Sequence, residues 1–335
     1  MSDVPSKITD AFGRTFDYLR IAVTERCNLR CQYCMPEEGV DFKHGERILS
    51  AEELIRVVSV LRSVGVKKVR LTGGEPLVRK DILSLVKGLA DLSGIESLHM
   101  TSNGLLFEKF AQPLLDAGLT GVNFSLDTFD EEKFKKITRR SGSDKVLAAI
   151  DRSLELGFTS VKVNVVAMRG FNDDEFYDFV ALTRDRPITV RFIELMPFDA
   201  EQIWKTGKFL KTAWLQEKLN EHYPELGETV GSSTEHAVYH VAGHQGKVAL
   251  IPAYSRTLCS ACSRIRLTAD GQIRNCLYSV EEFDLRGLLR GGASDDDIRR
   301  FFLDAMGQKV KDGWEAQERA KELGRKRTSM TQIGG

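Results

Sequence analysis

Six cysteines have the clearest capacity for chemistry in this sequence. They form two groups of three, the first with the spacing C-x3-C-x2-C and the second with the spacing C-x2-C-x13-C. The groups are Cys27, Cys31 and Cys34, then Cys259, Cys262 and Cys276. Scattered thiols that act only as small apolar side chains would rarely sort into two tight triads. The spacing therefore favours two metal sites.

The number of ligands in each triad distinguishes between metals. Structural zinc usually takes four Cys or His ligands. His44 lies ten residues after Cys34, and no histidine lies within the second triad, so each site is one ligand short of a zinc site. Three thiolates suit a [4Fe–4S] cluster whose fourth iron has no protein ligand, and that open iron is a reaction site. We expect two such clusters, with zinc as the alternative.

Composition limits the classes of partner. Lys and Arg number 48, as do Asp and Glu, so the formal net charge is zero and binding of a nucleic acid through the overall field is not expected. A local cationic pocket for a small anion remains open. The sequence has no apolar run long enough to span a membrane, and its first residues lack the apolar core of a signal peptide. We therefore expect a soluble, cytoplasmic protein with reduced cysteines and no nucleic-acid or membrane partner.

Short apolar strands alternate with amphipathic helices over residues 17–195. Ser50 and Glu53 form a capping box that predicts the start of the first helix. Six β-α steps predict parallel strands with right-handed crossovers, in a partial barrel or a doubly wound sheet. The strands are predicted at 17–23, 67–72, 97–101, 121–126, 160–167 and 188–195. Further helices are predicted at 80–91, 107–117, 143–156 and 173–184.

One face of every predicted strand is polar, which favours the barrel. A parallel sheet covered on both sides would be apolar on both faces, and a closed eight-stranded barrel would fill its interior with branched side chains. Edge strands facing solvent would not explain six strands that share one pattern. The predicted fold is thus α/β, a partial (βα)6 barrel with a wide polar lumen. The polar face comprises Arg20, Ala22, Thr24, Arg70, Thr72, His99, Thr101, Asn103, Asn123, Ser125, Asp127, Lys162, Asn164, Glu194 and Met196.

The pattern changes after residue 196, which divides the chain into a barrel region, 1–196, and a C-terminal region, 197–335. Residues 197–230, with Trp204 and Trp214, are predicted to be irregular and helical. Antiparallel strands are expected at 236–251 and 264–277, with a hairpin turn at Asp270-Gly271. Helices follow at about 281–290 and 295–305. The charged end, 311–335, contains Arg325-Lys326-Arg327, and an end of this kind is usually mobile and solvated.

Two loops that follow strands carry the remaining signals. The first triad lies directly after the first strand, at the end of a barrel where active sites are found. Tyr33 within it either stacks on a planar ligand or packs in the core. Gly73-Gly74-Glu75-Pro76 follows the second strand, and its glycines allow the backbone to approach a ligand closely.

A C-x3-C-x2-C triad combined with this glycine pair in a β-α barrel resembles the radical S-adenosylmethionine enzymes, whose fold is a partial (βα)6 barrel. The resemblance implies that the open iron binds the amino and carboxylate groups of S-adenosylmethionine. One electron then cleaves the sulfonium, and the resulting 5′-deoxyadenosyl radical abstracts a hydrogen atom from the substrate. It also implies four residues that contact S-adenosylmethionine: Tyr33, Gly74, Ser125 and Met196.

The second triad, followed by Arg264-Ile265-Arg266, is similar to the GTP 3′,8-cyclase family, which begins molybdenum cofactor biosynthesis. The motifs Thr24-Glu25-Arg26-Cys27, Leu71-Thr72-Gly73-Gly74-Glu75-Pro76-Leu77 and Thr101-Ser102-Asn103-Gly104 extend the similarity over nearly the whole chain. The resemblance implies a second cluster that binds guanine and a radical at ribose C3′ that attacks guanine C8. The implied product is (8S)-3′,8-cyclo-7,8-dihydroguanosine 5′-triphosphate.

Further expectations come from the same resemblance. Thr101 and Ile265 join the GTP contacts, and Gly334 and Gly335 enter the active site. The implied partners are a reductant protein, cyclic pyranopterin monophosphate synthase as the next enzyme, and a second copy of the chain in a homodimer.

The residues themselves agree with a triphosphate substrate. Several cations are needed, and Arg suits bidentate contacts with phosphate. Because the sequence has neither G-x-x-x-x-G-K-[ST] nor G-x-G-x-x-G, side chains must hold the phosphates. The alternative is that each cation is a solvated surface residue. The candidates are Arg20, Arg70, Lys162, Arg264 and Arg266.

Two rival interpretations remain. A peptide-modifying maturase with two clusters usually carries more cysteines in its C-terminal region than the three present here. A non-catalytic electron carrier or zinc-stabilised binding module predicts closed sites with four ligands and no cleavage of S-adenosylmethionine.

Overall fold

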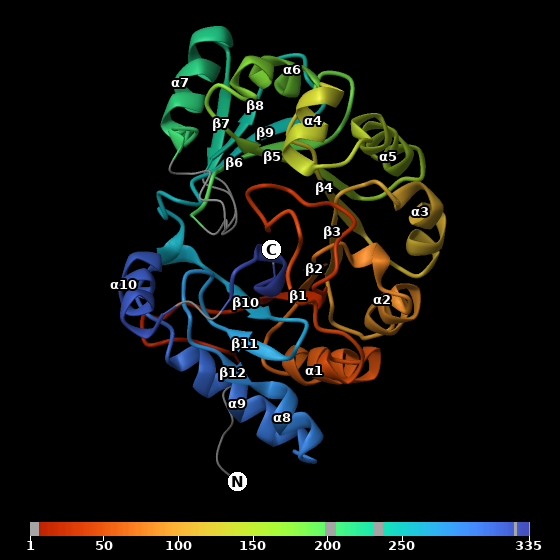
Figure 1. The fold of residues 1–335 in the computed structure, drawn as a ribbon, viewed down its shortest axis with the longest axis vertical. Helices are drawn as coiled ribbons and strands as arrows, with labels where there is room; N and C mark the ends of the chain where they lie inside the picture. The colour runs from red at the N-terminus through yellow and green to blue at the C-terminus, as the bar shows by residue number, and fades with distance from the viewer. Residues whose placement is uncertain (1–6, 198–205, 231–236, 325–326, 335) are drawn as a thin grey trace.

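In the part of the chain that the structure describes, the fold is built on one curved sheet of twelve strands. The computed structural model describes residues 7–197, 206–230, 237–324 and 327–334, and Trp204, Arg325, Lys326 and Gly335 lie outside these ranges. The strand order is β12-β11-β10-β1-β2-β3-β4-β5-β6-β9-β8-β7. Figure 1 shows helices α1 to α5 on the outer side of the curve and the C-terminus inside it.

The predicted partial barrel is confirmed. Strands β1 to β6 pair with one another in parallel and in sequence order, with helices as the crossovers. The elements of this part are β1 (Tyr18–Thr24), α1 (Ala51–Arg62), β2 (Lys68–Gly73), α2 (Ile82–Ala90), β3 (Ser97–Ser102), α3 (Phe107–Asp116), β4 (Gly121–Ser125), α4 (Glu131–Thr138), α5 (Ser143–Glu155), β5 (Ser160–Ala167), α6 (Phe176–Ala181) and β6 (Thr189–Glu194).

Alternation along the strands separates the core from the lumen. Leu19, Ile21 and Val23 on β1 are completely buried under the outer helices, whereas Arg20 on the same strand lines the cavity described below. The capping box of α1 is confirmed: the backbone N–H of Glu53 donates to Ser50 Oγ, and the backbone N–H of Ser50 donates to Glu53 Oε2.

The C-terminal region adds strands to both edges of the barrel sheet. The hairpins are antiparallel as predicted, with β8 against β9 and β10 against β11. In addition, β10 pairs in parallel with β1, and β9 pairs in parallel with β6. The elements here are α7 (Thr212–His222), β7 (Gly227–Val230), β8 (Ala237–His240), β9 (Lys247–Ile251), β10 (Arg264–Leu267), β11 (Gln272–Arg274), β12 (Phe283–Asp284), α8 (Leu285–Arg290), α9 (Asp295–Gly307) and α10 (Gly313–Leu323).

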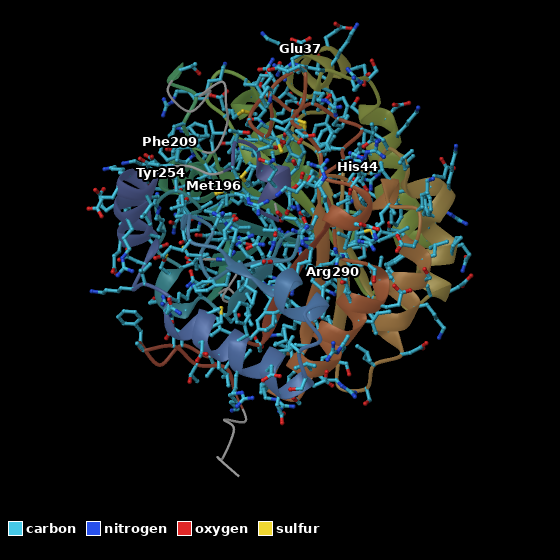
Figure 2. The ribbon with its side chains drawn as sticks, turned by 60° about the horizontal axis from the view of Figure 1, so that its bottom comes forward. Glu37, His44, Met196, Phe209, Tyr254 and Arg290 are labelled. Atoms are coloured by element: carbon cyan, nitrogen blue, oxygen red, sulfur yellow. The ribbon has the colours of Figure 1, made fainter. Side chains whose placement is uncertain are left out.

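Helix α8 is fixed to the first barrel helix by charged side chains. Arg290, labelled in Figure 2, donates from Nε and Nη2 to the carboxylate of Glu53 on α1. Both groups are partly exposed, so this pair contributes little on its own.

The prediction of a mobile, solvated C-terminal end is wrong for the residues that the structure describes. Residues 313–323 form α10, and residues 327–334 run into the barrel. Ser329, Thr331 and Ile333 are buried there. The charges of this end predicted solvent exposure, but Arg327 is paired with buried carboxylates instead. Within the described ranges, no helix is both long enough and apolar enough to cross a bilayer.

Candidate active site

A cavity of about 290 Å³ occupies the lumen of the barrel. It brings together side chains from strands at both ends of the predicted barrel and from the C-terminal region. Twelve of the residues predicted from the sequence line it: Arg20, Cys27, Cys31, Tyr33, Cys34, Arg70, Gly74, Thr101, Ser125, Met196, Arg264 and Arg266.

The second cysteine triad lines an adjoining cavity of about 90 Å³. Cys259, Cys262 and Cys276 all contribute to its wall. The two cavities share six lining residues, so the two triads lie on either side of a common wall. The shared residues are Met196, Ile251, Ala253, Arg264, Arg266 and Leu277.

Three predicted site residues lie outside the cavity lining, and a fourth is not described. Among the residues described, neither Lys162 nor Ile265 belongs to the cavity lining. The side chain of Ile265 is completely buried in the core, and the residue pairs with Leu19 on β1. Gly334 lies next to the cavity, where its carbonyl accepts a hydrogen bond from Arg266. Gly335 lies outside the described residues.

The first cysteine loop is held from both sides by backbone hydrogen bonds. The N–H groups of Arg30 and Gln32 donate to the last carbonyls of α4, on Thr138 and Ile137. The carbonyl of Cys34 accepts from the C-terminal segment, through the backbone N–H of Met330 and the hydroxyl of Ser329. The conformation of the triad therefore depends on both a barrel helix and the end of the chain.

The glycine pair after β2 lines the cavity and also allows a close approach between two backbone segments. A Cβ atom on Gly73 would lie 2.1 Å from the carbonyl oxygen of Thr24, and one on Gly74 would lie 2.1 Å from that of Arg26. The N–H groups of Gly74 and Glu75 donate to those same carbonyls at 2.8 Å. The glycines thus let β2 pack directly against the backbone that leads into Cys27.

Glu75 is a buried acceptor beneath the first triad. Its carboxylate accepts from Ser102 Oγ and from the backbone N–H groups of Leu77 and Asn103. Burial raises the pKa of Glu75 to about 7. Asn103 Nδ2 donates to Asn28 Oδ1 and lies 3.8 Å from Cys27 Sγ, so the β3 loop is oriented toward the triad.

The thiols of the first triad are strongly desolvated. Burial raises the pKa of Cys27 to about 11 and that of Cys34 to about 12, and it also raises the pKa of Cys31. Thiolates at these positions need a cation to stabilise them. Within the described ranges, no three His, Cys, Asp or Glu side chains gather tightly enough to hold a single metal ion. A shared four-iron cluster has no such requirement, because each cysteine binds a different iron, and the donor set fits that group.

The second triad lies among cations. Burial alone would raise the pKa of Cys262, but the positive charges of Lys309 and Arg264 lower it to about 7. Arg14, itself buried, donates from Nη1 to the carbonyl of Cys259. These surroundings favour a thiolate that is ready to bind metal.

Arginines stand side by side on the lumen face. Arg20 pairs across the sheet with Arg70 on β2 and with Arg266 on β10. Burial, followed by repulsion from Arg20 and Arg264, lowers the pKa of Arg266. An anion bound in the cavity would offset this repulsion.

Arg191 also lines the cavity, and the sequence analysis missed it. Asn164 on β5 pairs with Arg191 on β6, so both face the lumen, whereas Phe192 is buried in the core. The prediction placed Glu194 and Met196 on the lumen face, and both line the cavity. It did not recognise that Arg191 and Ile193, earlier in β6, also line it. Apolar Val190 and Phe192 on either side of Arg191 were the signal that would have identified it.

Glu194 reaches the cavity because it ends the strand. Its completely buried carboxylate accepts hydrogen bonds from the backbone N–H groups of Thr212, Tyr254 and Ser255. These bonds fix the loop after β9 beside Met196. Figure 2 labels Met196 near Phe209 and Tyr254, whose rings have centroids 4.9 Å apart.

Comparison with known proteins agrees with this arrangement. Residues 21–183 match the Radical SAM superfamily, and residues 188–314 match Molybdenum Cofactor Synthesis C. The GTP 3′,8-cyclase of Chlorobaculum tepidum is 44% identical over 98% of this chain and 97% of that protein. The mitochondrial GTP 3′,8-cyclase of Arabidopsis thaliana is 45% identical over 91% of this chain and 78% of that protein.

Other relatives are longer or more distant. Molybdenum cofactor biosynthesis protein 1 of Homo sapiens is 42% identical over 90% of this chain, which spans 48% of that protein. Streptococcus suis SuiB bound to S-adenosylmethionine has a TM-score of 0.60 at 16% identity, covering 84% of this chain and 67% of that one. A likeness at this identity shows the fold alone. Together with the two family matches, the nearly full-length similarity to the cyclases shows that the chain belongs to the GTP 3′,8-cyclase family of radical S-adenosylmethionine enzymes.

Proposed function

We propose that this protein converts GTP to (8S)-3′,8-cyclo-7,8-dihydroguanosine 5′-triphosphate in molybdenum cofactor biosynthesis. The observation that carries the proposal is the shared wall: Arg264, Arg266 and Met196 line both the barrel cavity and the cavity of the second triad. A substrate held at this wall meets one cysteine triad on each side, and the cyclases to which the chain is 44–45% identical carry the same activity in their names.

The residues present fit the cofactors that this reaction requires. Cys27, Cys31 and Cys34 would hold one [4Fe–4S] cluster, and Cys259, Cys262 and Cys276 a second one. When bound, the first cluster and S-adenosylmethionine supply the 5′-deoxyadenosyl radical that removes the hydrogen atom from ribose C3′. Tyr33, Gly74, Ser125 and Met196 line the cavity and would hold S-adenosylmethionine.

A hydrogen bond orients the side chain of Tyr33. Its hydroxyl donates to Asp127 Oδ2 at 2.6 Å, and burial raises the pKa of Asp127 to about 6. The ring is therefore held by a carboxylate that lies two residues after the end of β4. A fixed ring loses little conformational freedom when a ligand packs against it.

The triphosphate is assigned to the cationic part of the lumen. Arg20, Arg70 and Arg191 line it, and Arg264 and Arg266 extend the charge to the shared wall. Guanidinium groups on rigid strands can bind phosphate oxygens with little loss of freedom. Thr101 contributes a hydroxyl to the same cavity. Lys162 and Ile265 remain candidates that act from outside the lining, Lys162 through its charge and Ile265 through its backbone.

Residues of the C-terminal segment restrict the entry of water. Met330 and Thr331 line the cavity, and Gly334 contacts Arg266. A radical formed in this space would otherwise react with solvent or with surrounding side chains. By the family resemblance, Gly334 and Gly335 are assigned to the reaction site, where they would assist radical formation or substrate positioning.

The proposal includes several partners. Reductive cleavage of a sulfonium needs an electron, which a reductant protein must supply. The product retains a triphosphate and needs further rearrangement, assigned by the family resemblance to cyclic pyranopterin monophosphate synthase. A homodimer and a cytoplasmic location belong to the same proposal.

An anaerobic assay tests the function directly. Reconstituted protein is incubated with reductant, S-adenosylmethionine and GTP, and mass spectrometry detects the nucleoside products. We expect 5′-deoxyadenosine together with cyclised GTP, and about eight iron atoms per chain. 5′-Deoxyadenosine without cyclised GTP would contradict the proposed substrate. Bound zinc with neither product would support the binding module instead.

A further inference from the structure

A cluster of buried charged side chains lies where the C-terminal segment meets the loops of both triads. We call it the charge cluster. Its members come from five separate segments of the chain, and each is half-buried or buried. They are Glu25, Lys43, Asp270, Arg274, Glu282 and Arg327.

Arg327 makes the largest number of contacts in the charge cluster. Its Nε lies 2.5 Å from Glu282 Oε1, and its Nη2 lies 3.0 Å from both carboxylate oxygens of Asp270. Its Nη1 lies 3.6 Å from Glu25 Oε1. The side chains of Arg327 and Asp270 are each 6% exposed, and that of Glu25 is completely buried.

The remaining cations of the cluster do not replace Arg327. Lys43 Nζ contacts Asp270, and the backbone N–H of Lys43 donates to Glu25 Oε2. Arg274 Nη1 donates to Glu282 Oε1 at 2.7 Å. Three cations thus face three carboxylates in a buried space. Loss of one cation leaves an uncompensated negative charge, which is strongly unfavourable.

The cluster joins the segments on which the site depends. Glu25 lies two residues before Cys27, and Asp270 lies on the turn between Cys262 and Cys276. Arg327 begins the segment that reaches the cavity, and its Nη1 also donates to the carbonyl of Gln332 at 3.1 Å. The same guanidinium therefore connects both cysteine loops with the turn that precedes Gly334.

We propose that Arg327 is a positioning residue, which latches the C-terminal segment into the barrel so that Gly334 stays against Arg266. This inference rests on the proposed function, because it concerns turnover at the same site. It assigns no chemical step to Arg327, which acts through the placement of the segment 329–334.

The variant Arg327→Met tests the latch in the reconstituted holoenzyme. It keeps an unbranched apolar stem and removes the positive charge together with the N–H donors of the guanidinium. We expect amide hydrogen exchange in 327–334 to rise at least tenfold, because the segment is released. We also expect kcat for cyclised GTP, per chain loaded with iron, to fall at least tenfold. A purely structural role would lower melting temperature or iron content and leave kcat per loaded chain unchanged.

Two further variants serve as controls. Arg319→Met removes an arginine from exposed α10, where its partner is Glu315, and is expected to leave exchange and kcat unchanged. Arg327→Lys keeps one charge but cannot bind two carboxylates with a rigid fork, so it should restore part of both properties. If Arg327→Met fails to fold, Glu282→Gln allows the same measurements with a smaller change. It removes one of the two carboxylates that bind Arg327 most closely, so exchange in 327–334 should rise and kcat should fall by less than in Arg327→Met, and no change in either would overturn the latch.

The outcomes separate the latch from the function. A wild-type enzyme that makes no cyclised GTP would refute the proposed function, whatever the exchange data show. An active wild type with a protected segment in Arg327→Met would overturn the latch. A released segment with undiminished kcat would also overturn it, because position would then have no consequence for turnover.

Discussion

Arg266 on β10 donates a hydrogen bond from Nη1 to the backbone carbonyl of Gly334, with 3.2 Å between the two atoms. Arg266 is only 5% exposed, and it lines both cavities. A guanidinium carries five N–H donors in a rigid fork. The hydrogen bond to Gly334 uses one of these donors. It helps to fix the guanidinium of Arg266 at the shared wall.

Arg266→Ala is expected to weaken binding of GTP. Loss of one charged hydrogen bond costs about 1.5–3 kcal/mol, which corresponds to an increase in Kd of roughly 10- to 150-fold. Equilibrium binding of GTP to the reconstituted protein measures the effect. Arg300→Ala is the matched control, because Arg300 lies on α9 with its side chain 64% exposed. Equal affinity in the two variants would remove Arg266 from the substrate contacts.

Cys276→Ala is expected to separate the two clusters. The second triad would lose its cluster, so iron content should fall from about eight to about four atoms per chain. Cleavage of S-adenosylmethionine should continue at the first triad, while cyclised GTP disappears. Analysis of iron together with both nucleoside products measures these effects.

Cys27→Ala provides the reciprocal control and should abolish cleavage of S-adenosylmethionine. Normal production of cyclised GTP by Cys276→Ala would mean that the second triad has only a structural role. Continued cleavage in Cys27→Ala would exclude the first triad from the mechanism.

Local patterns predicted the barrel well for a physical reason. Leu19, Ile21 and Val23 alternate with Arg20 and Ala22, so strand β1 can be identified from its own residues. Each barrel strand has a buried face and a polar face, and the cavity is the space between the polar faces. Residue type and alternation therefore identified most of the cavity lining before any contact was known.

Pairing between distant segments was not visible in the sequence. The parallel pairing of β10 with β1 brings Arg266 beside Arg20, although the two residues are far apart along the chain. The docking of Arg327 has the same origin, because its carboxylate partners lie on three other segments. A charged C-terminal segment is expected to be exposed to solvent when the carboxylates that pair with it are not known. At β6, the acidic side chain of Glu194 at the end of the strand led to an assignment of the polar face that left out Arg191.

Stability of the docked segment should depend on acid pH through Asp270. Burial alone would raise its pKa, but hydrogen bonds and charges from Arg327 and Lys43 lower it from 3.8 to about 2. A carboxyl group with a lowered pKa stabilises the folded state above its unfolded pKa, and this contribution is lost as pH falls toward the folded pKa. The shift corresponds to about 2 kcal/mol at neutral pH.

Asp270→Asn tests this dependence. The difference in unfolding free energy between wild type and variant should be constant from pH 7 to pH 5 and should shrink as pH falls below about 4. Denaturant unfolding at each pH measures it. Asp296→Asn is the control, because Asp296 is 68% exposed and its pair with Arg299 is solvated. If the difference in unfolding free energy did not change with pH, ionisation of Asp270 would not contribute to stability in the way proposed.

Gly74→Ala is expected to displace the loop that carries the first triad. A Cβ atom at this position would lie 2.1 Å from the carbonyl oxygen of Arg26, which belongs to the backbone and cannot rotate away. Because Arg26 directly precedes Cys27, relief of this overlap must move the cysteine. We expect loss of about four iron atoms per chain and of S-adenosylmethionine cleavage, with the second cluster retained.

Gly307→Ala is the matched control for this substitution. A Cβ atom on Gly307 meets no atom within 4 Å, and the residue ends α9. Alanine there should be neutral or stabilise the helix by up to about 1 kcal/mol. Iron content and product yield should therefore remain at the wild-type level. If Gly74→Ala also retained the first cluster, the close packing of β2 against the cysteine loop would not be what positions Cys27.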